Sequence, residues 1–112
     1  MGQLFYGDTA EPIEFPDRLL AHLKVVITTK LRRAESFTLS WRHLDGDAGG
    51  RSSLWLQESI PLRFVFDSAE PEQLDGHMLQ DMAHRSNASS GLVVDLREFA
   101  PVDQRASLAP VA

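Results

Sequence analysis

The 112-residue sequence contains no cysteine. This absence excludes a disulfide framework, a thiolate nucleophile and any zinc or iron–sulfur site with cysteine ligands. No hydrophobic run is long enough to span a membrane, and the first residues lack the basic and apolar segments of a signal peptide. We therefore expect a cytoplasmic protein that does not associate with membranes.

Catalytic and metal-binding motifs are also missing. The histidines form no His-x-x-x-His or His-Glu-x-x-His pair, and no Gly-x-Ser-x-Gly elbow is present. The glycine-rich residues 46–51 precede a predicted strand, which favours a hairpin loop over a phosphate-binding loop. We expect no catalytic site, no cofactor and no metal, and we interpret the histidines as solvated residues on helix surfaces. They are His22, His43, His77 and His84.

The composition that remains is typical of a globular protein. Apolar residues make up 43% of the chain and charged residues 24%. A chain of this length fits a single domain with a core of its own. We expect that domain to cover residues 1–97 and to be followed by a mobile C-terminal tail over residues 98–112.

The apolar pattern of the first half predicts two strands, a helix and a third strand. Residues 3–7 and 12–15 form the first hairpin, and Asp17 is the predicted N-cap of the helix. After Ala34 the apolar period changes to two, which indicates a half-buried strand. The helix stripe and the inward side of that strand comprise Leu19, Leu20, Leu23, Val26, Ile27, Leu31, Phe37, Leu39 and Trp41.

The second half continues with strands at 53–57 and 62–67, a helix and a strand at 92–96. Pro71 is the predicted first residue of that helix, and Gly76 would then lie inside it at a cost of roughly 1 kcal/mol. The whole order is ββ-α-βββ-α-β. This order predicts the α+β class, with one mostly antiparallel sheet and two helices packed on one of its faces.

The charge of the chain is unevenly distributed. The net charge is −5, yet residues 18–51 contain seven Lys or Arg and three acids, whereas residues 52–112 contain four Arg and nine acids. We predict a basic patch in this region. Its tryptophans, where they are exposed, would be platforms on which nucleic-acid bases stack. The alternative roles are cations that complement a helix C-terminus and aromatic side chains of the core. The candidate contact residues are Lys30, Arg32, Arg33, Arg42, Arg51, Trp41 and Trp55.

Four segments carry a resemblance to a known group of proteins. They are Gly-Gln-Leu-Phe-Tyr-Gly at 2–7, the helical residues 17–33, Ser-Leu-Trp-Leu at 53–56 and Ile-Pro-Leu-Arg-Phe-Val-Phe at 60–66. Over residues 2–96 the chain resembles a family of small uncharacterised actinobacterial proteins that often carry the name "ATP-dependent DNA ligase". That resemblance implies an enzyme of DNA metabolism.

The nucleophile of such a ligase is missing from the sequence. These ligases form a lysyl–AMP intermediate on the lysine of a Lys-x-Asp-Gly motif. Here the two stretches ending in Asp-Gly, 43–46 and 73–76, begin with histidine and glutamine, and the only lysines are Lys24 and Lys30. We therefore expect a non-catalytic binding or accessory domain that contacts a protein or, more weakly, a nucleic acid. The alternatives are a ligase-like enzyme and a structural module that forms homodimers.

Overall fold

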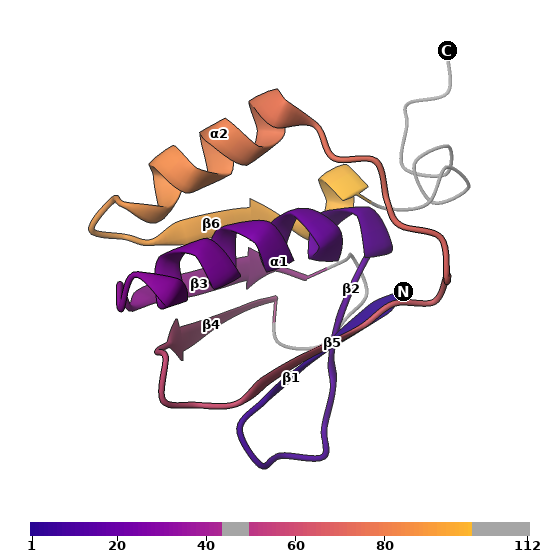
Figure 1. The fold of residues 1–112 in the computed structure, drawn as a ribbon, viewed down its shortest axis with the longest axis horizontal. Coiled ribbons are helices and arrows are strands. Elements are labelled where there is room, and N and C mark those ends of the chain that lie inside the picture. The colour runs from indigo at the N-terminus through magenta and orange to yellow at the C-terminus, as the bar shows by residue number, and fades with distance from the viewer. Residues whose placement is uncertain (44–49, 100–112) are drawn as a thin grey trace.

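The computed structural model of the protein describes residues 1–43 and 50–99 (Figure 1). Its elements follow the predicted order and confirm the α+β class. A short 3-10 helix, η1, was not predicted and closes the described chain. The elements are β1 (Gly2–Tyr6), β2 (Ile13–Phe15), α1 (Asp17–Arg32), β3 (Phe37–Arg42), β4 (Arg51–Leu56), β5 (Leu62–Val65), α2 (Gly76–Ser86), β6 (Leu92–Asp95) and η1 (Leu96–Phe99).

The strands are divided between two three-stranded sheets, where the sequence predicted one sheet. The first sheet has the order β2-β1-β5 and is antiparallel throughout. The second has the order β4-β3-β6, in which β3 is antiparallel to β4 and parallel to β6. The division arises because β5 returns to pair with β1, with Phe64 opposite Leu4, after the chain has already built β3 and β4.

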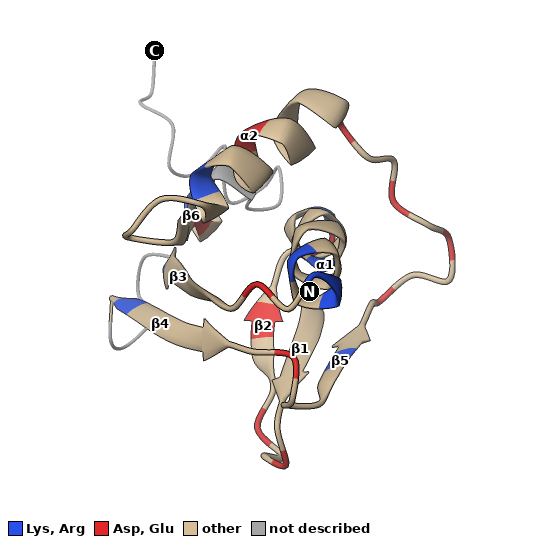
Figure 2. Ribbon diagram, turned by 60° about the vertical axis from the view of Figure 1, so that its left-hand side comes forward, with Lys and Arg blue, Asp and Glu red and all other residues tan. Residues whose placement is uncertain are grey.

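Helix α1 lies in the middle of the molecule, between α2 and the first sheet (Figure 2). Its predicted apolar stripe is buried from Leu19 to Ile27 and partly buried at Leu31, and the helix runs through the β-branched residues 25–29, which confirms the helical reading of that run. The two sheets meet through Phe15 of β2 and Trp41 of β3, whose rings are edge to face with centroids 5.2 Å apart. Such aromatic pairs contribute stability beyond the area that they bury.

The start of α1 differs from the prediction. Pro16 occupies the N-cap position, and Asp17 is the first helical residue. The Asp17 carboxylate instead accepts a hydrogen bond from the backbone N–H of Asp67, with N and Oδ2 3.1 Å apart. Asp17 therefore holds the chain that leaves β5 against the start of α1, a long-range role that no local pattern indicates.

The start of α2 is also a correction. The helix begins at Gly76, not at Pro71, and its N-cap is Asp75, whose carboxylate accepts the backbone N–H groups of His77 and Met78. Gly76 therefore lies at the first helical position, where the predicted penalty of an interior glycine does not apply. The predicted start at Pro71 lies in the extended segment that connects β5 with this cap.

The predictions for the loop around residues 45–50 and for the tail fall largely outside the described residues. Within the part of the chain that is described, no helix is long and apolar enough to cross a membrane.

Candidate functional site

One face of the second sheet is covered by neither α1 nor α2 in the part of the chain that the structure describes. Side chains alternate between the two sides of a strand, so the register of β3 with β4 decides which residues share a side. The pairs Phe37–Leu56 and Leu39–Leu54 face the core. The intervening pairs face away from it. We call this surface the open face; its residues are Thr38, Ser40, Arg42, Arg51, Ser53, Trp55, Val93 and Asp95.

Trp55 is the largest side chain on the open face, and 57% of its surface is exposed. Its backbone is held in place because the Tyr6 hydroxyl donates to the Trp55 carbonyl over 2.6 Å. Val93, on the edge strand β6, is 49% exposed on the same face. The hydroxyls of Ser40 and Ser53 lie between Trp55 and the arginines, and they hydrogen-bond to each other at 2.7 Å. Val93 is directly opposite Ser40 in the register.

The end of the open face near the β3–β4 connection is positively charged. Arg42 and Arg51 are directly opposite each other in the register, and Asp95 is opposite Arg42 on the other side. The Asp95 carboxylate is held by Arg97, with Nη2 and Oδ2 3.0 Å apart, and this hydrogen bond lowers the pKa of Asp95. Arg97 binds this carboxylate directly, Arg42 lies beside it on β3, and Arg51 lies on the far side of Arg42 on β4. Residues 44–49, which include two acids, lie outside the described residues.

Most acids of the described residues lie away from the open face. Figure 2 shows them along the segment between β5 and α2 and in the loop between β1 and β2. The first of these segments contains Asp67, Glu70, Glu72 and Asp75. The net charge of −5 is therefore compatible with a basic end on the open face.

Beyond Trp55, at the opposite end from Arg42 and Arg51, the open face continues into a groove of about 390 Å³. Thr38 and Trp55 form one wall, and the loop after α2 with Asn87 and Gly91 forms another. Lys30 also lines the groove, but it is only 8% exposed. Its Nζ donates to Oδ1 of Asn87 at 2.7 Å and to Oε1 of Glu35 at 3.3 Å, and it lies over the ring of Phe37.

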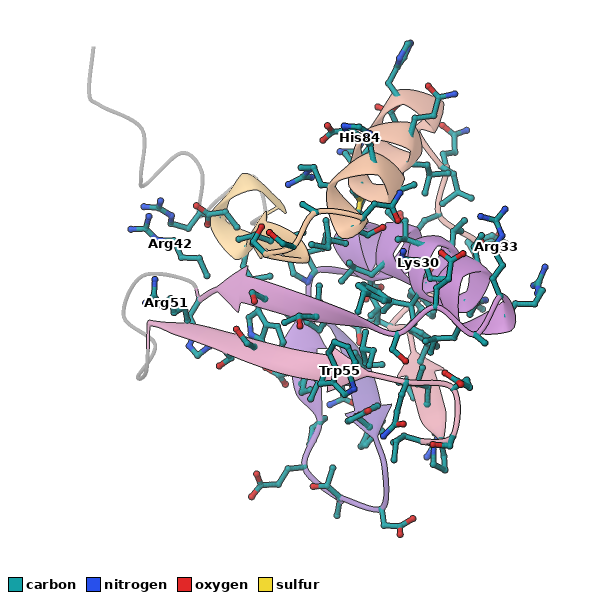
Figure 3. The ribbon with its side chains drawn as sticks, turned by 90° about the vertical axis from the view of Figure 1, so that its left-hand side faces the viewer. Lys30, Arg33, Arg42, Arg51, Trp55 and His84 are labelled. Atoms are coloured by element: carbon teal, nitrogen blue, oxygen red, sulfur yellow. The ribbon has the colours of Figure 1, made fainter. Side chains whose placement is uncertain are left out.

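The structure divides the predicted basic patch into two groups (Figure 3). Arg42 and Arg51 lie together at one end of the β3–β4 pair, whereas Lys30 and Arg33 lie at the other, with Trp55 between them. Arg32 and Arg33 are exposed at the end of α1. The two groups are separated because β3 begins just after α1 and runs its whole length before reaching Arg42.

Trp41 is not available as a stacking platform. It is 7% exposed and belongs to the core, where it packs against Phe15. Lys30 is likewise a structural residue, because its ammonium group joins the end of α1 to the loop after α2. The exposed members of the predicted set are Trp55, Arg42 and Arg51 on the open face, together with Arg32 and Arg33 at the end of α1.

Sequence reasoning missed three residues of this region. Val93 and Asp95 belong to the open face through the parallel pairing of β6 with β3, and Arg97 reaches Asp95 from η1. Alternation within Leu92–Asp95 could have indicated that Val93 and Asp95 share the outward side of this strand, since Leu92 and Val94 are buried on the other side. The choice of β3 as the neighbour of β6 had no local signal.

His22 corrects the interpretation of the histidines. Its side chain is fully buried between α1 and the start of α2. His43 is also a correction, because it follows β3, is half-buried and hydrogen-bonds to Ser52 with its Nε2. His77 and His84 are exposed on α2, as predicted, and Asp81 pairs with Arg85. Across residues 1–43 and 50–99, no group of three or more His, Asp or Glu side chains is arranged to hold a metal ion.

The chain was compared with models of protein families, with curated proteins and with solved structures. The model described as "Domain of unknown function (DUF7882)" matches residues 1–97. No curated protein and no solved structure matches the chain.

Proposed function

This chain belongs to the DUF7882 family, and we propose that it is a non-catalytic, cytoplasmic binding domain whose contact surface is the open face of β4-β3-β6. The observation that carries the proposal is the exposure of Trp55 on strand β4, on a sheet face that no helix of the described residues covers. The location rests on the cysteine-free composition.

The distribution of exposed apolar side chains supports the choice of surface. Among the described residues, the large hydrophobic side chains with high exposure are Met1, Trp55, Leu74 and Val93. Two of these four lie on the open face. Tryptophan and arginine are also the residues that contribute most often to binding energy at protein contacts. A surface that combines Trp55 and Val93 with two arginines is therefore the best contact surface in the described chain.

Site-specific photo-crosslinking tests the surface whatever the partner is. A photoreactive amino acid at position 93 leaves Trp55 intact, and matched controls at Arg63 on β5 and Gln80 on α2 are exposed on other surfaces. In cells that make the protein, we expect adducts from position 93 but not from the two controls. Trp55→Ala in the position-93 protein should abolish them. Equal adducts from all three positions, or none from any, would contradict the proposal.

Self-association is the structural alternative, and the same experiment identifies it. An adduct between position 93 and a second copy of the chain would show that the open face is a homodimer interface. Light scattering of the purified protein would then give a mass of two chains. Trp55→Ala should return that mass to one chain, whereas Arg63→Ala should not.

The ligase alternative rests on the resemblance of the sequence, and the structure supplies no nucleophile for it. Asp75–Gly76, which ends one of the two incomplete motifs, forms the start of α2. Lys30 is buried, and its ammonium group donates hydrogen bonds to Asn87 and Glu35. Lys24 is exposed on α1, with its ammonium group near the ring of Phe66. Incubation with labelled ATP and magnesium should therefore give no covalent adenylate. A labelled protein band on a denaturing gel would instead support the ligase alternative.

A further inference from the structure

We infer that the open face binds single-stranded nucleic acid, with Trp55 stacked on a base and Arg42 and Arg51 in contact with phosphates. The inference rests on the proposed function and names the partner class. Its evidence is the exposed ring of Trp55 and the pair of arginines on the same face.

The arginine pair favours an anionic partner. Arg42 and Arg51 are directly opposite each other on adjacent strands, an arrangement in which like charges repel. Asp95 does not neutralise them, because both of its carboxylate oxygens bind Arg97. Neither Arg42 nor Arg51 forms an ion pair with another described residue. A phosphate placed between the two guanidinium groups would relieve this repulsion with charge-assisted hydrogen bonds.

Trp55 favours a partner with accessible flat rings. Its side chain extends from a sheet, and the bases of a single strand can separate and stack on such an aromatic surface. The bases of a duplex are already stacked on each other and offer only their edges. Single strands are therefore the form of nucleic acid that uses both Trp55 and the arginines.

The spacing along β4 suits a short segment of strand. Trp55 and Arg51 are four residues apart and lie on the same side, so their Cα atoms are about 14 Å apart at the usual rise of a strand. The hydroxyls of Ser40 and Ser53 lie between them, where they can bond to sugar or phosphate oxygens. Glu35 lines the groove beyond Trp55. Glu35 pairs there with Lys30, so the lining of the groove offers no unpaired cation to a phosphate, and the backbone of the strand should run from Trp55 toward the arginines.

Binding of labelled oligonucleotides to the full chain tests this inference. At low ionic strength, single-stranded DNA or RNA should bind more tightly than a duplex of the same sequence. The logarithm of the binding constant should fall with the logarithm of the salt concentration with a slope of about −0.7 per phosphate, or about −1.4 for two phosphates. No binding of single strands at low ionic strength would overturn the inference, as would tighter binding of the duplex.

Substitutions separate the two contacts from general electrostatic attraction. Trp55→Ala should weaken binding about 5- to 150-fold, the loss expected for one base–aromatic stack. Trp55→Phe should restore most of it. Arg42→Ser with Arg51→Ser should reduce the salt slope toward zero, whereas the exposed Arg63→Ser on β5 should leave it unchanged. Unchanged affinity in Trp55→Ala, with the native circular dichroism spectrum, would contradict the stacking role.

The photo-crosslinking experiment keeps this inference distinct from the proposed function. Protein adducts from position 93 together with no oligonucleotide binding would reject the nucleic acid and keep the contact surface. Oligonucleotide binding that is unaffected by Trp55→Ala and by the arginine substitutions would place the nucleic acid elsewhere on the chain. Absence of both adducts and oligonucleotide binding would reject both proposals.

Discussion

The backbone N–H of Asp75 donates a hydrogen bond to Nε2 of His22 over 2.9 Å, although 53 residues separate the two in the sequence. The other ring nitrogen of His22, Nδ1, lies 2.7 Å from the carbonyl oxygen of Arg18. A carbonyl accepts only and an amide N–H donates only, so the proton of the ring is on Nδ1. His22 thereby joins one turn of α1 to the N-cap of α2.

Removal of this imidazole should destabilise the whole domain. His22→Ala leaves a buried cavity and an unpaired N–H at Asp75, and we expect it to lower the free energy of unfolding by about 3 kcal/mol. The matched control is His84→Ala, which changes an exposed residue of α2 and should cost less than about 0.5 kcal/mol. Urea unfolding measures both. Equal effects in the two variants would mean that the buried contact contributes nothing specific.

The two tryptophans should respond to substitution in opposite ways. Trp41→Ala removes a core ring that packs against Phe15, and we expect a loss of about 3–5 kcal/mol in the free energy of unfolding. Trp55→Ala removes an exposed ring and should change stability by less than about 0.5 kcal/mol. Thermal unfolding followed by circular dichroism distinguishes them. A large loss of stability in Trp55→Ala would show that this side chain is structural.

Gly91 and Gly50 provide a matched pair at positive φ. Gly91 has φ 76° and Gly50 has φ 67°. A Cβ at Gly91 would also lie 2.2 Å from the carbonyl oxygen of Thr38, whereas nothing lies within 4 Å of one at Gly50. Gly50→Ala should therefore cost only the backbone strain, about 1–2 kcal/mol. Gly91→Ala should cost clearly more, because β6 must move away from β3. The comparison of the two unfolding midpoints checks this, and similar midpoints would contradict the close approach.

Stability should decrease in acid. The N–H groups of Met78 and His77 lower the pKa of Asp75, and the hydrogen bond from Arg97 lowers the pKa of Asp95. A carboxyl whose folded pKa lies below its unfolded pKa stabilises the fold above the unfolded value of about 3.9, and this contribution disappears as the pH falls through the folded pKa. Urea unfolding at a series of pH values below about 5 should show the loss. The double variant Asp75→Asn with Asp95→Asn should show a shallower dependence, and an identical one would contradict the assignment.

Local patterns predicted the elements well and their partners poorly. The apolar stripe from Leu19 to Ile27 identified α1 because it repeats at the helical period and is long enough to outweigh the β-branched residues. The start of α2 could not be found in this way. Pro71 is a plausible first residue by local rules, but the helix begins after Asp75, where His22 holds the backbone. The split into two sheets depends on the pairing of β5 with β1, which is likewise a long-range contact.

The candidate site was predicted in part for the same reason. The alternation that placed Trp41 with Phe37 and Leu39 already indicated a buried ring. Trp55, in contrast, alternates with Leu54 and Leu56 and shares its side of β4 with Arg51 and Ser53. Neighbourhood in sequence suggested one basic patch between residues 30 and 51. The length of β3 divides these residues into two groups, one at each end of the strand, since Phe37 and Arg42 are about 17 Å apart at the usual rise of a strand.

The pairing of the strands also determines when the chain can fold during synthesis. The first sheet, β2-β1-β5, lacks its edge strand β5 until residues 62–65 have been made. The second sheet, β4-β3-β6, lacks its edge strand β6 until residues 92–95 have been made. A shorter nascent chain therefore exposes unpaired strands and half of a core on the ribosome. No fragment that ends before β6 contains a complete second sheet, so the protein folds as one unit only when nearly all of its described length is available.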